Sequence, residues 1–270
     1  MTELGELLKL YSFESVYKSE DEKAIADWIE WWLDDNKIEN YERIGNTIFR
    51  LGNIEAPILS AHLDQVKTNG KAVKFYMNDD EKIIAFNDKW EQTSLGADDK
   101  NGIWIILQAL KTFPDHINFI ISEGEETGCH GIHMLEDEKL LDLLVDERQF
   151  CMVLDRKGNR DMLKSGGGST FCSTLAQDLC NFLEQDFEVT TGSISDTCTL
   201  CKYCESVNMS VAYENPHTYK EITDYKRLKE IKEHVIDVID NFVHYSTPPS
   251  VYQKSYTSTY KGGYYDGYRY

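Results

Sequence analysis

The sequence has 270 residues, with 47 acidic against 28 basic side chains and a formal net charge of −19. Nucleic acids and anionic membranes are therefore not expected as partners, because both require a basic surface. No apolar run approaches the roughly 18 residues of a membrane span, and the N-terminal residues lack a secretion-signal pattern. The seven cysteines lack the spacing of a disulfide framework. We therefore expect a globular cytoplasmic protein.

Helical and strand patterns alternate along most of the chain. In order, they predict a helix over 3–11, a second helix capped by Ser19, strands over 46–51 and 56–63, a hairpin of 71–77 with 82–87, a helix over 99–112, a strand over 117–122, helical segments over 130–147, a strand over 150–154, helices over 169–185 and 196–203, a strand over 206–212 and a helix over 221–244. This alternation is typical of an α/β fold, a three-layer α/β/α sandwich around a mixed, mostly parallel central sheet.

The C-terminal segment differs in composition from the rest. Residues 247–270 are rich in Tyr, Gly and Ser and contain no aliphatic residue after Val251. Such a segment cannot bury a core of its own. We therefore expect one domain over residues 1–246, followed by a flexible tail.

Polar residues with metal-binding side chains follow several apolar strands, and another one precedes a helix. They are His62, Asp64, Glu125, Glu126, Asp155 and His217 after strands, and Asp98 in the loop before the helix at 99–112. Sites in α/β sheets gather at the carboxyl ends of strands, so we expect these residues to share one site. Two imidazoles with several carboxylates are suitable ligands for a pair of cations such as Zn²⁺, Co²⁺ or Mn²⁺.

Each of these residues also has a simpler interpretation. Asp98 with Asp99, or Glu125 with Glu126, could compensate the dipole at the start of a helix. His62 and Asp155 could be satisfied polar groups at the edge of the core. The late histidine has competitors in His116, His130 and His133.

Five motifs together resemble those of the co-catalytic zinc exopeptidases, a superfamily that includes peptidase T, carboxypeptidase G, aminoacylase and the lidless zinc aminopeptidases. The motifs are HxD at 62–64, GADDKNG at 96–102, EETG at 125–128, a strand-terminal aspartate at 155 and a late histidine at 217. They occur in the order of the family, and the resemblance covers residues 5–240. It implies that residues 1–246 form a zinc-exopeptidase-like catalytic domain.

The resemblance also implies a role for each site residue. Two divalent ions, zinc or alternatively cobalt or manganese, would share Asp98 as a bridging carboxylate. His62 and Asp155 would complete one ion site, and Glu126 and His217 the other.

Two further residues would act beside the metals. Glu125 would be the general base on a metal-bridging water, and Asp64 would orient His62. The family often has a cis peptide bond after the bridging aspartate, which predicts one between Asp98 and Asp99.

Only about 60 residues separate Asp155 from His217, too few for the lid or dimerisation domain that many relatives insert there. Without that domain no dimer is implied, and the carboxypeptidase interpretation weakens because the lid supplies carboxylate-binding groups. We therefore expect an aminopeptidase that acts on small peptides. An N-acyl amino acid deacylase and a carboxypeptidase remain alternatives, as does a catalytically inactive binding protein; Tyr213 is one conceivable oxyanion-stabilising residue.

Overall fold

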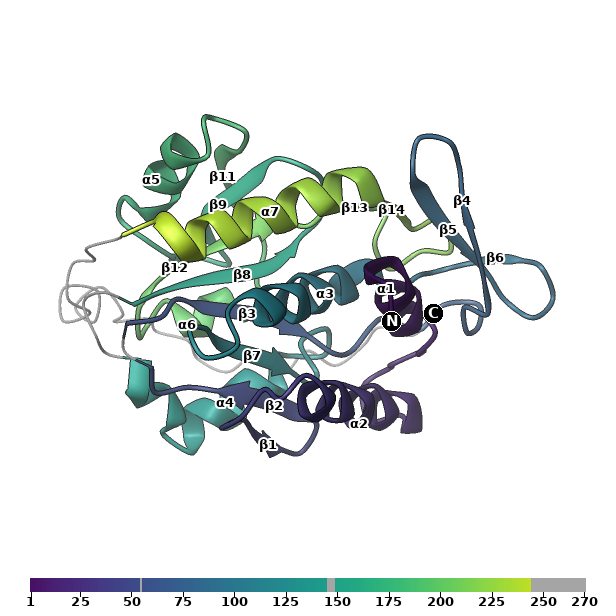
Figure 1. Cartoon of the computed structure of the whole chain (residues 1–270), viewed down its shortest axis with the longest axis horizontal. Helices are drawn as coiled ribbons and strands as arrows, with labels where there is room; N and C mark the ends of the chain where they lie inside the picture. The colour runs from purple at the N-terminus through teal and green to yellow at the C-terminus, as the bar shows by residue number, and fades with distance from the viewer. Residues whose placement is uncertain (54, 145–148, 244–270) are drawn as a thin grey trace.

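The computed structural model describes residues 1–53, 55–144 and 149–243. Within these ranges the chain forms a nine-stranded sheet, a five-stranded sheet and helices on both sides of the larger sheet (Figure 1). The helices are α1 (Glu3–Tyr11), α2 (Glu20–Asp35), α3 (Ala97–Thr112), α4 (His130–Asp137), the 3-10 helix η1 (Leu140–Leu144), α5 (Leu175–Phe182), α6 (Thr197–Leu200) and α7 (Tyr225–Asn241). The strands are β1 (Glu42–Ile44), β2 (Thr47–Arg50), β3 (Ile58–His62), β4 (Lys74–Met77), β5 (Lys82–Phe86), β6 (Gln92–Thr93), β7 (Asn118–Ser122), β8 (Phe150–Arg156), β9 (Asp161–Gly166), β10 (Ser169–Thr170), β11 (Glu188–Gly192), β12 (Glu205–Ser210), β13 (Tyr213–Glu214) and β14 (Ile222–Asp224).

The larger sheet is mixed, and its parallel part lies in the centre. Its strands follow the order β1-β2-β7-β3-β8-β12-β9-β10, and β11 pairs with β9. The neighbours β7, β3, β8 and β12 run parallel, with Ala61 opposite Ile121 and Leu59 opposite Met152. The carboxyl ends of these four strands therefore lie along the same edge of the sheet.

The two faces of this sheet bury separate apolar cores. Side chains alternate along a strand, so Phe119 and Ile121 of β7 enter one core while Ile120 enters the other. The first core also contains apolar residues of α1, α2, α3, α5 and α7, and the second those of α4, η1 and α6. Figure 1 shows α3 and α7 crossing in front of the sheet. The predicted three-layer α/β/α sandwich around a mixed, mostly parallel sheet is confirmed.

The predicted helix over 169–185 is wrong at its start. Residues 169 and 170 form β10, which pairs antiparallel with β9. Gly167 and Gly168 have φ angles of +57° and +84°, a region that glycine enters without the steric cost of a Cβ atom. This glycine turn folds the chain back onto β9, and α5 begins only at Leu175.

The last helix begins later than the predicted residue 221. Residues 222–224 form β14, which pairs with β5 of the predicted hairpin and with β13. Asp224 then caps α7 by accepting a hydrogen bond from the Arg227 backbone N–H at 2.9 Å. The smaller sheet of β4, β5, β6, β13 and β14 is thus built from two distant parts of the chain, and it fixes the loop that carries His217.

The chain between Asp155 and His217 extends the central sheet and carries no separate lid domain. All of its residues are described, and they form the end of β8 followed by β9, β10, α5, β11, α6, β12 and β13. The predicted tail at 247–270 lies outside the described residues. No helix in the described ranges is long and apolar enough to cross a membrane.

Candidate metal centre and active site

The predicted site residues lie at the carboxyl edge of the central strands. His62 ends β3, Asp64 follows it, Glu125 and Glu126 follow β7, Asp155 lies near the end of β8, Asp98 is in the first turn of α3 and His217 is between β13 and β14. Because β7, β3 and β8 are adjacent and parallel, their ends are neighbours. The structure therefore brings together side chains that are up to 155 positions apart in the sequence, from 62 to 217.

Asp98 lies between the two histidines. Its Oδ1 is 3.2 Å from His62 Nε2, and its Oδ2 is 3.1 Å from His217 Nε2. Burial alone would raise the pKa of Asp98, but its bonds with His217 and His62 lower it far below the ordinary value. Asp98 is thus an ionised carboxylate whose two oxygens face two different imidazoles, the arrangement that a bridging ligand requires.

The hydrogen bonding of His62 leaves its Nε2 atom directed at carboxylates. Nδ1 lies 2.9 Å from the backbone oxygen of Asp64, which can only accept, so Nδ1 carries a proton. Nε2 then faces Asp98 Oδ1 and Asp155 Oδ1, at 3.2 and 3.4 Å. A neutral imidazole would point a lone pair at two anionic oxygens, a repulsive arrangement that a cation between them would make favourable.

The pKa values of this buried group show the same excess of negative charge. Burial lowers the pKa of His62, but bonds with Asp155, Asp64 and Asp98 raise it well above the ordinary value. For the carboxylate of Asp155, burial has the opposite effect and raises the pKa to about 7, although the contact with His62 lowers it. A positive charge on this side of Asp98 is therefore strongly favoured.

His217 and Glu126 make a close contact on the other side of Asp98. The Nε2 atom of His217 is 2.6 Å from Oε1 of Glu126, yet this buried oxygen has no hydrogen-bond partner among the described residues. The imidazole and the carboxylate therefore lie side by side next to Asp98. The carboxylates of Asp98 and Glu126 raise the pKa of His217 to about 10.

The segment GADDKNG has an unusual backbone that places Asp98. The predicted cis peptide bond between Asp98 and Asp99 is confirmed. Asp99 is buried and accepts backbone hydrogen bonds from His62 and Gly102, each at 3.2 Å. A Cβ atom at Gly102 would lie 2.1 Å from the backbone oxygen of Leu154. Glycine is required there because α3 packs directly against β8.

Asp64 connects the ends of β3 and β7. Its carboxylate accepts hydrogen bonds from the backbone N–H groups of Glu125 at 2.9 Å and Glu126 at 3.1 Å. The same carboxylate is 3.5 Å from His62 Nδ1, farther than the backbone oxygen of Asp64 itself. Asp64 therefore supports His62 mainly through its backbone and uses its side chain to fix the turn with both glutamates.

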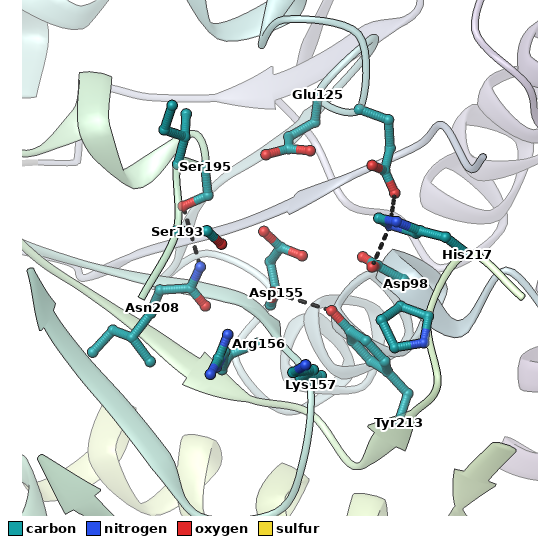
Figure 2. A pocket seen from close by; sticks show the side chains of 14 residues that line it. Asp98, Glu125, Asp155, Arg156, Lys157, Ser193, Ser195, Asn208, Tyr213 and His217 are labelled. Atoms are coloured by element: carbon teal, nitrogen blue, oxygen red, sulfur yellow. Dashed lines mark hydrogen bonds and ion pairs between the residues drawn. The ribbon is translucent and has the colours of Figure 1, made fainter. Parts of the chain in front are cut away.

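Glu125 is half-buried beside the candidate metal ligands. Figure 2 shows its carboxylate directed into a cavity, across from Asp155. Burial raises the pKa of Glu125 to about 9, and the carboxylates of Asp155, Asp196 and Glu126 also raise it. Its position is suitable for a group that exchanges a proton with a molecule in the cavity.

The cavity has a volume of about 320 Å³. Its lining includes most of the predicted site, together with residues that the sequence analysis did not single out (Figure 2). The full lining is Asp98, Glu125, Glu126, Asp155, Arg156, Lys157, Leu163, Ser193, Ile194, Ser195, Asn208, Tyr213, Pro216 and His217. The Tyr213 hydroxyl, one candidate for oxyanion stabilisation, donates to the backbone oxygen of Asp155 at 3.2 Å.

The residues present fit divalent cations. Two groups have ligand atoms that all lie within 4.8 Å of one another: His62 with Asp98 and Glu126, and His62 with Asp99 and Asp155. Imidazole nitrogen and carboxylate oxygen are the donors that zinc and similar ions bind. In the second group, Asp99 already accepts two backbone hydrogen bonds, whereas the two carboxylate oxygens of Asp98 face the two histidines.

Glu221 is a buried member of the site that the sequence did not reveal. It accepts hydrogen bonds from the Asp98 backbone N–H at 3.3 Å and from Ser94 Oγ at 2.5 Å. Glu221 is 123 positions from Asp98, and it precedes a short strand whose pairing with the hairpin was not predicted. No local pattern marked it.

Comparison with protein-family models and with curated protein sequences gives no match. Solved structures do match. An aminopeptidase PepT from Bacillus cereus ATCC 10987 aligns with a TM-score of 0.68 at 15% identity, covering 88% of this chain and 97% of that chain. A tripeptidase from Staphylococcus aureus gives 0.68 at 17% identity, with 88% and 96% covered.

A third neighbour is the TET1 peptidase of Pyrococcus horikoshii, which is reported to assemble into a tetrahedron or a large octahedral shell. It aligns with a TM-score of 0.65 at 12% identity and covers 88% of this chain and 99% of that chain. Identities this low establish similarity of fold. The chain therefore has the α/β fold of these peptidases.

Proposed function

We propose that this chain is a two-metal-dependent hydrolase that cleaves an amide bond at the end of a small peptide, as an aminopeptidase. The observation that carries the proposal is the position of Asp98, whose two oxygens face His62 and His217 at 3.2 and 3.1 Å. The names of the structural neighbours, an aminopeptidase and a tripeptidase, support a peptide substrate.

Five residues would hold two divalent cations, zinc or alternatively cobalt or manganese. His62 and Asp155 would bind one ion, Glu126 and His217 the other, and Asp98 both. The chemistry supplied by such a pair is polarisation of the scissile carbonyl and activation of water at neutral pH. Asp64 and Asp99 would keep this set in place through their backbone hydrogen bonds.

Glu125 would carry the proton during the reaction. Its carboxylate is directed into the cavity (Figure 2), so it can take a proton from the attacking water and deliver it to the leaving amine. The cavity of about 320 Å³ has a size suited to the end of a short peptide.

A comparison of two variants tests this proposal. The protein is purified, loaded with zinc and assayed on aminoacyl amides, short peptides and N-acyl amino acids. Glu125→Gln is expected to keep the metal content of the wild type and to lose roughly 10²- to 10⁴-fold in activity, because only the proton carrier changes. His62→Ala is expected to lower the metal content itself, measured by elemental analysis.

The two readouts separate the possible failures. Normal hydrolysis by Glu125→Gln would show that another group carries the proton. Wild-type metal content in His62→Ala would reject the ligand assignment. Cleavage of N-acyl amino acids with no cleavage of peptides bearing a free amino group would replace the aminopeptidase by the deacylase alternative, since both reactions use the same residues.

A further inference from the structure

The cavity beside the metal-binding residues has a basic wall. Arg156 and Lys157 line it on the side away from His217, and they follow directly after Asp155 (Figure 2). Only three of the fourteen lining residues, Leu163, Ile194 and Pro216, have purely aliphatic side chains. The wall therefore offers positive charge and hydrogen bonds rather than an apolar surface.

A local irregularity in the sheet explains how consecutive residues line the same cavity. Val153 pairs with Asn208 and Arg156 pairs with Ser210, so the register between β8 and β12 shifts by one residue before the end of β8. Successive side chains of a regular strand point to opposite faces, and a bulge changes this direction, often beside active sites. Asp155 and Arg156 can thus both reach the cavity.

The guanidinium of Arg156 is held in place but not saturated. Its Nε atom donates to Asp161 Oδ2 at 2.9 Å, and its side chain is 22% exposed. Among the described residues this is the one hydrogen bond of the guanidinium, and it leaves both terminal amino groups free to donate to a ligand. A guanidinium with two parallel donors matches the geometry of a carboxylate.

Asn208 adds a buried acceptor to the same wall. It is 3% exposed, and its side-chain N–H donates to Ser195 Oγ at 3.2 Å. Ser195 Oγ in turn donates to Thr197 Oγ1 at 2.9 Å, which fixes the orientation of the amide. The Oδ1 atom of Asn208 has no hydrogen-bond partner among the described residues. An unpaired buried acceptor is costly, and an N–H group of a bound molecule would satisfy it.

We propose that Arg156 and Lys157 bind a carboxylate of the substrate close to the scissile bond, while Asn208 accepts an N–H of the same substrate. This inference rests on the proposed function, because it names the substrate class of that site. Two sources share this chemistry: the side chain of an acidic residue and the free terminal carboxylate of a very short peptide.

The charges around the cavity agree with this preference. Asp98, Glu126 and Asp155 would be offset by two divalent cations, so they would not repel an anionic substrate. Arg156 retains Asp161 as a partner, and Lys157 is exposed at the rim with no ion-pair partner among the described residues. A carboxylate entering the cavity would therefore meet unpaired positive charge, although the whole chain is strongly acidic.

Three dipeptide probes distinguish the two sources. Glu-Ala-amide carries only a side-chain carboxylate, Gln-Ala carries only a terminal one and Gln-Ala-amide carries neither. The values of kcat/KM are measured with the zinc-loaded wild type, and dissociation constants are measured by calorimetry with the zinc-loaded Glu125→Gln variant. We expect one carboxylate probe to exceed Gln-Ala-amide roughly 10- to 100-fold in both measurements, as for a charge-assisted hydrogen-bonded pair.

The preference ratio is the value for the favoured carboxylate probe divided by the value for Gln-Ala-amide. Arg156→Gln and Lys157→Gln are each expected to reduce this ratio severalfold or more. The matched control Asp161→Asn breaks the same Arg156–Asp161 ion pair but keeps the guanidinium, and it should preserve the ratio. Arg160→Gln removes an exposed arginine outside the cavity and should also preserve it. Melting temperatures identify any variant that fails to fold, and the exposed Lys157 provides a test that does not depend on Arg156.

The outcomes separate this inference from the proposed function. Peptide hydrolysis with equal rates on all three probes would overturn the carboxylate site and leave the peptidase intact. No hydrolysis of any probe, with the calorimetric preference retained, would overturn the peptidase and leave the carboxylate site. A ratio that survives both Arg156→Gln and Lys157→Gln would also overturn the assignment.

Discussion

Glu221 lies directly behind Asp98 and is completely buried. One of its carboxylate oxygens accepts the Asp98 backbone N–H, and the other accepts the hydroxyl of Ser94. Glu221 does not itself line the cavity, and it reaches the site through its hydrogen bond with Asp98, so we regard it as a positioning residue for Asp98. Partners of this kind fix the orientation of a metal ligand and affect the affinity for the ion.

We expect Glu221→Ala to weaken zinc binding by roughly 10- to 100-fold. Loss of the carboxylate frees the backbone at the start of α3, so the shared ligand is no longer held between the two histidines. Glu221→Gln keeps an acceptor for the Asp98 N–H and should restore most of the affinity. Zinc affinity is measured by competition with a chelator. Equal affinity in both variants and the wild type would mean that Glu221 serves only the core.

At the scale of elements, Glu22 at the start of α2 makes favourable local hydrogen bonds, but its carboxylate is buried in surroundings that disfavour a negative charge. Ser19 Oγ accepts the Glu22 backbone N–H at 3.1 Å, so Ser19 caps the helix as predicted. Glu22 in turn accepts the Lys18 backbone N–H at 2.7 Å. However, Glu22 is fully buried, and burial together with the carboxylates of Asp64 and Glu123 raises its pKa to about 7.

The raised pKa of Glu22 makes stability depend on pH. Since the folded pKa lies above the ordinary value of 4.5, the folded chain binds the proton more tightly than the unfolded chain. The free energy of unfolding therefore falls as pH rises from about 4.5 to 7. Glu22→Gln keeps the acceptor and removes the charge.

We expect Glu22→Gln to raise the free energy of unfolding by roughly 1–3 kcal/mol at pH 8 and to change it little near pH 4. Urea unfolding at both pH values measures the difference. A variant that is less stable than the wild type at pH 8 would contradict this account.

The elements that could be predicted are those with strong local patterns. The apolar run of β3, the Ser19 cap of α2 and the apolar length of α3 each determine their own structure. The short strands β10, β13 and β14 have only two or three residues each. β10 forms because the glycine turn returns the chain onto β9, and β14 forms by pairing with the distant β5 as well as with β13. Gly167 and Gly168 do not indicate whether the chain continues into a helix or turns back onto the preceding strand. A helix was therefore predicted where the chain turns back.

The same distinction applies to the site. His62, Asp98, Glu125, Glu126, Asp155 and His217 could be singled out as candidates because each lies in a motif with a family resemblance or follows an apolar strand. Arg156, Asn208 and Glu221 carry no such signal. Their importance depends on a register shift, on an unpaired buried oxygen and on a hydrogen bond across 123 positions, and each of these exists only in the folded chain.

At the scale of the whole molecule, α3 joins the parts of the domain. Its Trp104 is fully buried and donates through Nε1 to the Glu3 backbone oxygen of α1 at 3.0 Å. The Trp104 ring also lies edge-on to the Tyr225 ring of α7, with the ring centroids 6.0 Å apart.

Near the end of the described chain, Phe242 packs on Phe150 and Phe182 with ring centroids 5.6 and 5.3 Å apart. These contacts mark residue 242 as part of the domain.

A chain that ends at residue 246 should retain the fold and the proposed peptidase activity. It keeps Phe242, and the sequence of the removed segment cannot contribute a core. We expect activity within about twofold of the full chain and a melting temperature within a few degrees. Both are measured on the purified proteins. Loss of metal binding or activity would mean that the tail belongs to the catalytic domain.

The place of His217 in the chain has a consequence for biosynthesis. Asp98, Glu126 and Asp155 leave the ribosome long before the loop between β13 and β14 does. A nascent chain would thus carry only part of the proposed ligand set until just over four fifths of it, 217 of 270 residues, had been translated. The proposed peptidase site would therefore stay incomplete during most of the synthesis of the chain.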